Sequence, residues 1–184
     1  MFIGELLERL GIPYQVGGSV ASSFHGIYRT SEDIDVVIDP NREQLEALAR
    51  ELESEFYVSR AAIDEAFSHR STFNAIHEQT LFKVDFFLKG PTPFDAEELR
   101  RSIRKEVGDS PGHSVLLKSQ EDTILRKLDW FRRGGGVSDR QWNDVVSVLA
   151  ASRDSLDEAY LDRWAAELHV EDLLTRARGE AADL

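Results

Sequence analysis

Two aspartates separated by one residue, Asp33 and Asp35, are the first candidates for chemistry in this sequence. They open the run Asp33–Asp39 (DIDVVID), whose β-branched residues predict a buried strand with a polar start. Side chains alternate between the two faces of a strand, so both carboxylates point the same way. Neighbouring carboxylates repel each other unless a cation lies between them. A hard divalent cation such as Mg²⁺ prefers carboxylate and phosphate oxygens, so the pair predicts a magnesium site.

A third acid, Asp85, stands alone among apolar residues in the predicted strand 82–88 (FKVDFFL). An unpaired carboxylate inside a strand is costly, which suggests that Asp85 has a partner. If this strand lies beside 33–39, Asp85 completes a cluster of three carboxylates. We therefore predict that Asp33, Asp35 and Asp85 are catalytic residues and hold one or two Mg²⁺ ions.

The turn Gly17-Gly18-Ser19 lies between a predicted strand, 14–16, and a predicted short helix, 19–25. Glycines let a ligand approach the backbone closely, and the amides at a helix N-terminus attract phosphate. Ser19 adds a hydroxyl donor. The turn predicts a site for the triphosphate of an NTP whose metal lies on Asp33 and Asp35.

Each of these pieces also has a simpler explanation. The turn could be an ordinary turn, the Asp33–Asp35 pair a solvated strand end, and Asp85 the partner of a nearby cation or helix terminus. The order of the three pieces, with a strand, a turn and a helix around the first, favours a common site.

The pattern of Gly-Gly-Ser, thirteen intervening residues, Asp-x-Asp and a later strand aspartate resembles the signature of the nucleotidyltransferase superfamily. The stretch 29–35 (RTSEDID) is similar to that of its small antibiotic-modifying and toxin members. The resemblance spans roughly 14–149. It implies that Asp33 and Asp35 bind metal and nucleotide, and that Asp85 binds metal and helps to activate an acceptor hydroxyl.

The segment 121–145 is similar to the helical part of AbiEii-like abortive-infection toxins. This resemblance implies that Lys127 meets the triphosphate and that Asp144 supports the site. Arg29, which precedes the aspartate pair, is a further candidate for a phosphate contact. Taken as residues alone, Lys127 could instead pair with an acid on a solvated helix face, and Arg29 could form a surface salt bridge.

The elements around these residues predict an α/β (α+β) fold. We expect a nucleotidyltransferase-fold mixed sheet flanked by helices, followed by a helical C-terminal half. The core is predicted over 1–92, and a mostly helical region that packs on it over 93–184. A helix face is marked by Leu45, Leu48, Ala49, Leu52 and Phe56, and Ser119, Ser138 and Ser155 are predicted helix caps.

The composition narrows the class of protein further. The 184 residues include no cysteine, which excludes disulfides, thiol catalysis and cysteine zinc sites. The net charge of −12 disfavours nonspecific nucleic-acid binding. No apolar run approaches the ~20 residues of a membrane helix, and 1–10 predicts an amphipathic helix rather than a cationic leader. We expect a soluble, cytoplasmic protein with no membrane contact.

Together these features predict a metal-dependent nucleotidyltransferase of the EC 2.7.7 type. It would bind an NTP such as ATP, move the NMP to an acceptor hydroxyl and release pyrophosphate. The acceptor could be a protein, an RNA end or a small molecule such as an antibiotic. A toxin–antitoxin or phage-defence role, with an antitoxin partner, follows from the resemblance. The alternative is a non-catalytic module with the same fold that senses nucleotides or binds a partner.

Overall fold

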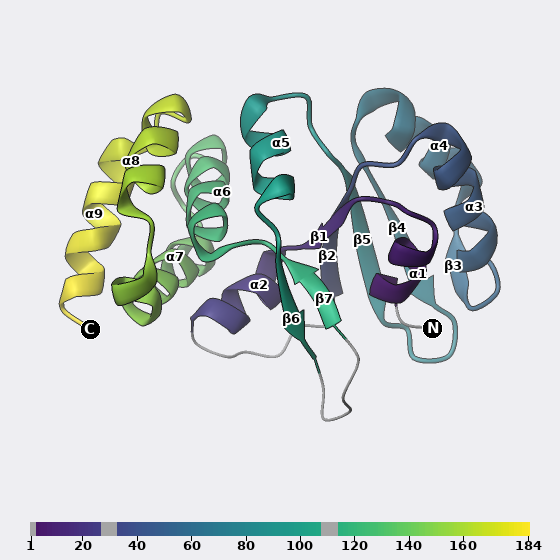
Figure 1. The fold of residues 1–184 in the computed structure, drawn as a ribbon, viewed down its shortest axis with the longest axis horizontal. Helices are drawn as coiled ribbons and strands as arrows, with labels where there is room; N and C mark the ends of the chain where they lie inside the picture. The colour runs from purple at the N-terminus through teal and green to yellow at the C-terminus, as the bar shows by residue number, and fades with distance from the viewer. Residues whose placement is uncertain (1–2, 27–32, 108–113) are drawn as a thin grey trace. The chain divides into compact units, whose positions relative to one another are not determined.

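Strands and helices are mixed through the first two thirds of the chain, and helices follow (Figure 1). The structure is a computed structural model that describes residues 3–26, 33–107 and 114–184. In chain order its elements are α1 (Ile3–Arg9), β1 (Tyr14–Val16), α2 (Gly18–His25), β2 (Asp33–Ile38), α3 (Arg42–Leu52), β3 (Phe56–Val58), α4 (Arg60–His69), β4 (Thr72–His77), β5 (Lys83–Leu88), α5 (Pro93–Arg100), β6 (Ile103–Glu106), β7 (Ser114–Leu117), α6 (Gln120–Arg133), α7 (Asp139–Ser152), a 3₁₀ turn (Arg153–Ser155), α8 (Glu158–Glu167) and α9 (Glu171–Ala182).

Seven strands of the described chain form one mixed sheet in the order β3-β4-β5-β2-β1-β7-β6. The pairs β2–β5 and β1–β7 are parallel, and the other neighbours are antiparallel. The two predicted aspartate strands, β2 and β5, are therefore direct neighbours. The predicted mixed sheet flanked by helices is confirmed.

The two faces of the central strands differ in polarity because their side chains alternate. Val36 and Ile38 of β2, with Val84, Phe86 and Leu88 of β5, are buried on the core face. Their odd-numbered neighbours lie on the opposite face and are only half-buried. This alternation leaves one face of the sheet for packing and the other for polar chemistry.

The helix predicted through Phe56 ends earlier than expected. α3 buries Leu45, Leu48, Ala49 and Leu52, but Phe56 begins the short strand β3 instead. The backbone N–H of Glu53 bonds to Ala49 at the helix end, and the aromatic and β-branched run that follows favours a strand. The helix α4 was not among the expected elements.

The strands β6 and β7 follow Pro93, in a part of the chain where mostly helix was expected. Each has only four residues. β6 lies at the sheet edge and carries the polar sequence IRKE, which has no hydrophobic alternation to mark it. Its pairing with β7 fixes its conformation.

The chain forms two compact units. The first comprises residues 1–18 and 31–118, and contains the sheet, and the second comprises 19–30 and 119–184. In the second unit α7 packs against α6 and α9, with a core that includes Leu125, Leu128, Val145, Leu149 and Leu161.

The caps of the second unit follow the prediction for two of three serines. The side chains of Ser119 and Ser138 cap α6 and α7. Ser155 was a wrong prediction, because it lies in the 3₁₀ turn and Asp157 caps α8 by accepting from the Tyr160 N–H. A carboxylate suits the helix dipole as a cap.

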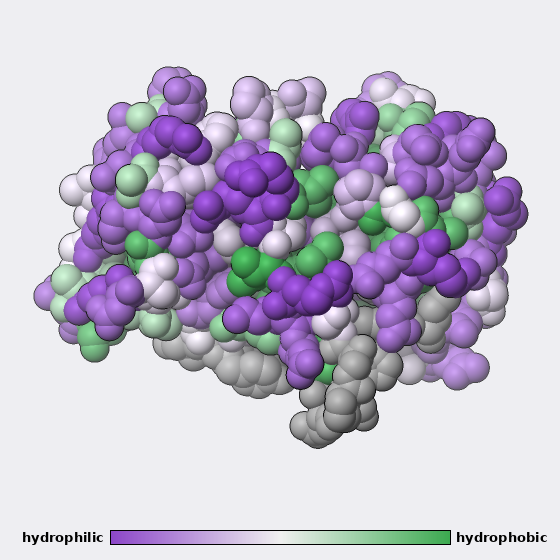
Figure 2. Space-filling view, in the orientation of Figure 1, coloured by the Kyte–Doolittle hydropathy of each residue, from purple (hydrophilic) through white to green (hydrophobic). Residues whose placement is uncertain are grey.

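Hydrophilic residues cover most of the surface drawn in Figure 2, and hydrophobic residues form small patches. Within the described ranges, each helix is too short or too polar to cross a membrane.

Candidate active site

The structure brings the three predicted acids together on one face of neighbouring strands. Asp35 of β2 is the register partner of Asp85 of β5, and Asp33 lies two residues before Asp35. Residues that are paired in a sheet point to the same face, so all three carboxylates share the polar face. A common metal site for the three aspartates requires that their carboxylates lie on the same face of the sheet, as they do here.

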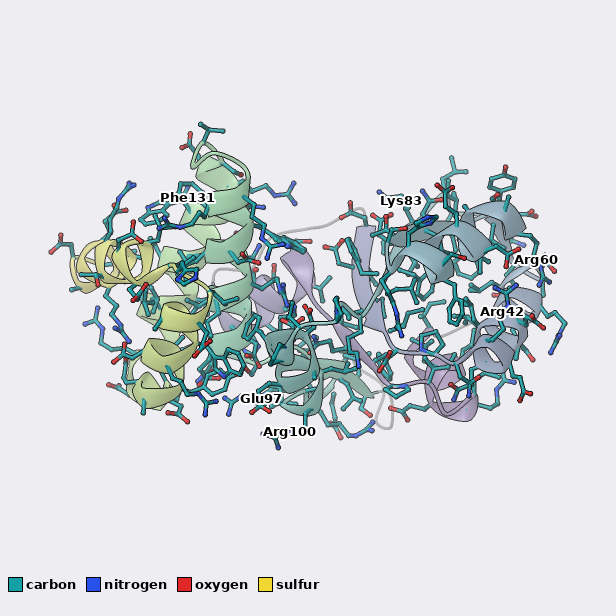
Figure 3. All side chains as sticks on the ribbon, turned by 90° about the horizontal axis from the view of Figure 1, so that it is seen from above. Arg42, Arg60, Lys83, Glu97, Arg100 and Phe131 are labelled. Atoms are coloured by element: carbon teal, nitrogen blue, oxygen red, sulfur yellow. The ribbon has the colours of Figure 1, made fainter. Side chains whose placement is uncertain are left out.

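The ammonium group of Lys83 lies among these carboxylates. Figure 3 labels Lys83 on its strand. Its Nζ is 2.7 Å from Asp85 Oδ2 and 3.8 Å from Asp33 Oδ2. The hydrogen bond to Asp85 raises the pKa of Lys83, the charges of Asp85, Asp33 and Asp35 raise it further, and burial opposes them. All three acids therefore act on one cation.

The donor set fits a divalent cation, which the resemblance to nucleotidyltransferases implies. Carboxylate oxygens are what Mg²⁺ prefers, and the position of Lys83 shows that a cation is stabilised between them. Across the described ranges, no three His, Cys, Asp or Glu side chains are already arranged as ligands of one ion. Metal binding by Asp33, Asp35 and Asp85 remains a prediction.

Gly17 and Gly18 lie directly beside the carboxylates. The Gly17 N–H donates to the Asp35 carbonyl at 2.9 Å. Gly18 has a φ of +55°, and a Cβ on it would stand 1.6 Å from Asp35 Oδ2. Only glycine leaves room for this carboxylate, so the turn and the acids form one arrangement.

The remaining predicted residues lie elsewhere in the chain. Ser19 is buried in the first turn of α2. Arg29 lies outside the described residues. In the second unit, Lys127 of α6 donates to Asp144 of α7, with Nζ 2.7 Å from Oδ2 and both side chains nearly buried. The structure thus joins Lys127 to Asp144, and their part in nucleotide binding remains a prediction.

Sequence reasoning missed three residues near the acids. Lys83 and Asn74 both flank Asp85, Lys83 on the same strand and Asn74 as its register partner on β4. Lys83 could have been found, because residues two apart in a strand share a face. Lys118 follows β7 and lies beside Gly17, where a Cβ would be 3.5 Å from Lys118 Cε.

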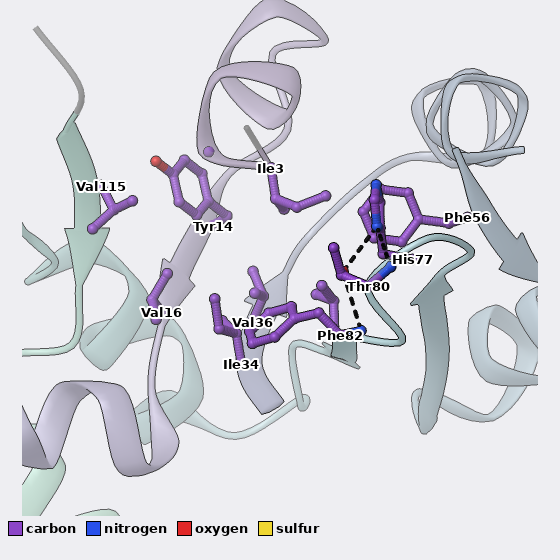
Figure 4. Close-up of a pocket in the computed structure, with 12 residues that line it drawn as sticks. Ile3, Tyr14, Val16, Ile34, Val36, Phe56, His77, Thr80, Phe82 and Val115 are labelled. Carbon is purple, nitrogen blue, oxygen red and sulfur yellow. Dashed lines mark hydrogen bonds between the residues drawn. The ribbon is translucent and has the colours of Figure 1, made fainter. Parts of the chain in front are cut away.

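A cavity of 270 Å³ lies on the other face of the sheet (Figure 4). Its lining is mainly apolar and includes Ile34, Val36 and Val84, which point away from the aspartates. Its polar edge is the turn after β4, where His77 Nδ1 is 2.9 Å from Thr80 Oγ1. The cavity is therefore separate from the carboxylate cluster.

The fold is that of nucleotidyltransferases. The structure of ANT(2'')-Ia in complex with adenylyl-2''-tobramycin is similar over 91% of this chain and 93% of that one, with a TM-score of 0.55 and 17% identity. An antigenic nucleotidyltransferase-like protein from Paracoccidioides brasiliensis is similar over 97% of this chain and 89% of that one, with a TM-score of 0.54 and 17% identity. Comparison with curated sequences gives no significant match.

The sequence model described as "Nucleotidyl transferase AbiEii toxin, Type IV TA system" matches residues 16–182. The chain belongs to this family, and it is an enzyme of the nucleotidyltransferase type. The predicted resemblance is confirmed.

Proposed function

We propose that this protein is a Mg²⁺-dependent nucleotidyltransferase that moves an NMP from an NTP to an acceptor hydroxyl. The observation that carries the proposal is the register of Asp35 with Asp85, which puts three carboxylates on one face beside the Gly17–Gly18 turn. Such a cluster next to close-approach glycines suits a nucleotide that brings both a metal and phosphates.

The proposed roles follow from where the residues lie. The acceptor oxygen attacks the α-phosphorus, and the bond from that phosphorus to the α,β-bridging oxygen breaks, so pyrophosphate leaves. Asp85 takes the proton of the acceptor hydroxyl, and the turn at Gly17 and Gly18 orients the triphosphate. Asp33 and Asp35, with Asp85, would hold the metal, and a bound Mg²⁺ offsets the negative charge on the phosphates.

The three aspartates have different roles in this proposal, and single substitutions test these roles. Asp33→Asn and Asp35→Asn should weaken Mg²⁺-dependent nucleotide binding. Asp85→Asn should spare most binding and cut transfer by ~10²-fold or more, as expected for loss of a positioned base. Calorimetry with a non-hydrolysable NTP and pyrophosphate release from labelled NTP measure the two effects.

Asp39→Asn is the matched control, since Asp39 follows the same strand and pairs with Lys89 at 2.6 Å and Arg70 at 3.1 Å. It lies six residues from Asp33, ~20 Å along an extended strand. The Asp39→Asn variant should keep both nucleotide binding and nucleotidyl transfer. Equal loss of binding in all three aspartate variants would contradict the proposed roles.

A second candidate function has one observation in its favour. Because Lys83 already supplies a cation to the carboxylates, the fold could serve as a nucleotide-sensing or partner-binding module without turnover. Pyrophosphate release separates the two functions, because a binding module releases none.

The family description supports a toxin–antitoxin setting, and we propose that the enzyme is a cytoplasmic toxin that an antitoxin partner neutralises. The acceptor is a protein, an RNA end or a small molecule such as an antibiotic. Transfer of label from each of the four NTPs into these three fractions identifies the acceptor class.

A further inference from the structure

Four neighbouring strands align a row of residues across the polar face of the sheet. Asp85 on β5 pairs with Asp35 on β2, and the Asp35 carbonyl accepts from Gly17 at the end of β1. On the other side of β1, the Lys118 N–H donates to the Val16 carbonyl at 2.9 Å. The row therefore ends at Lys118, two strands away from Asp35, roughly 10 Å.

The side chain of Lys118 runs toward the turn. A Cβ placed on Gly17 would lie 3.5 Å from Lys118 Cε and 4.0 Å from its Nζ. A ligand lying against the backbone of Gly17 would therefore be next to this ammonium group. The turn has carboxylates on one side and a cation on the other.

Glu98 of α5 fixes the position of this ammonium group. Lys118 Nζ donates to Glu98 Oε2 at 2.9 Å, and the two side chains are 6% and 3% exposed. Removing two charges from water is expensive, and well-packed apolar side chains often replace such a pair without loss of stability. The pair thus has a cost that packing alone does not explain.

We propose that Lys118 binds the β- and γ-phosphates of the nucleotide at the Gly17–Gly18 turn, with Glu98 as its positioning residue. This rests on the proposed function, because it assigns a phosphate-binding residue to the same site. An ammonium group satisfies an anionic oxygen by a charge-assisted hydrogen bond, and the carboxylates on the other side of the turn cannot do so.

The test replaces the ion pair in the full chain by Lys118→Met/Glu98→Met, which removes both charges and avoids an unpaired buried charge. Calorimetry in Mg²⁺ measures binding of an ATP analogue with a methylene group as α,β-bridge, and of AMP. The variant should bind the analogue about tenfold more weakly, the effect of one hydrogen bond to a charged group, and bind AMP unchanged. If the pair had only a structural role, its removal would change the affinities for the ATP analogue and for AMP to the same extent.

The control is Lys89→Met/Asp39→Met, which removes a half-buried lysine–carboxylate pair of the same sheet (Nζ to Oδ2 2.6 Å) together with the contact of Asp39 to Arg70. It should bind both ligands as the wild type does. If the Lys118 variant binds the analogue as tightly as the wild type, the inference is overturned and the transferase proposal stands. If the wild type binds no analogue and releases no pyrophosphate from NTP, both proposals are overturned.

Should Lys118→Met/Glu98→Met fail to fold, Lys118→Gln and Lys118→Arg provide the same comparison, and only Lys118→Arg should retain affinity for the analogue.

Discussion

Gly18 is the residue at which backbone conformation and site chemistry constrain each other most closely. Its positive φ and its contact with Asp35 both require the absence of a side chain. These two requirements can be separated, because Gly135 also has a positive φ, +78°, with no atom within 4 Å of an added Cβ.

Gly18→Ala should therefore cost both stability and function. The strained backbone costs about 1–2 kcal/mol, and the methyl group displaces the Asp35 carboxylate, so nucleotide affinity should fall about tenfold or more. Gly135→Ala should lose similar stability and keep its affinity. Thermal unfolding and calorimetry measure the two quantities, and equal affinities for both variants would show that the Gly18 contact is not needed.

The residues that could be predicted from sequence were those whose type conflicts with their surroundings. Asp33, Asp35 and Asp85 stand out because acids in apolar strands are costly. Lys118 does not stand out, because it is one of six lysines and arginines within residues 118–140. Its place beside Gly17 depends on the pairing of β1 with β7, whose members are about a hundred positions apart.

At the scale of elements, the start of α6 depends on a buried acid. Glu121 Oε1 accepts the backbone N–H of Asp157 at 3.1 Å, which joins α6 to the cap of α8. Burial alone would raise the pKa of Glu121, but hydrogen bonds from Asp157, Glu121's own backbone, Ser119 and Gln120 together lower this pKa below the ordinary value of a glutamate.

Glu121→Gln tests this link through its pH dependence. A lowered pKa in the folded state means that ionised Glu121 stabilises the fold above its unfolded pKa, and that this is lost as pH falls through the folded value. The variant should be less stable by about 1 kcal/mol at pH 7, or about 2–4 °C in Tm, and the difference should shrink from about pH 4.5 downward. The exposed Glu167→Gln serves as the control, and a pH-independent difference would refute the ionic contribution.

Helices and strands were predicted reliably where a hydrophobic pattern extends over many residues. They were predicted poorly where pairing with a neighbouring strand determines the conformation. β2 and β5 carry clear hydrophobic patterns, and α6 carries a clear pattern and a serine cap. β3, β6 and β7 have three or four residues, too few for a period, and acquire their conformation from neighbouring strands. The helical second half was predicted from its caps and helical spacing, whereas the strand order was not predicted.

At the scale of the whole molecule, the question is how much the helical unit contributes to binding. The family resemblance predicts that Lys127 stabilises the triphosphate, because an NTP adds several negative charges to a protein that already holds three aspartates at its site. Its ion pair with Asp144 also means that a single substitution of Lys127 affects stability. Lys127→Ala would remove the ammonium group that contacts this nearly buried acid and so lower Tm.

Lys127→Met/Asp144→Met removes both charges and separates folding from binding. The apparent Kd for a non-hydrolysable NTP should rise about tenfold, about 1.4 kcal/mol. Unfolding without ligand reports the stability of the variant. An unchanged Kd would exclude the Lys127–Asp144 ion pair from nucleotide binding.

The division of the chain into two units has a practical consequence for the design of truncated proteins. Each unit is assembled from two separate stretches, and the short stretch of the second unit, 19–30, is embedded in the sequence of the first. A single cut after Lys118 would release a fragment that keeps α2 but lacks α7, whose Ser152 Oγ bonds to the His25 carbonyl. The complementary fragment would lack α2. Neither unit can therefore be produced by truncation at one position, and exchange of helical units between relatives would need two grafts.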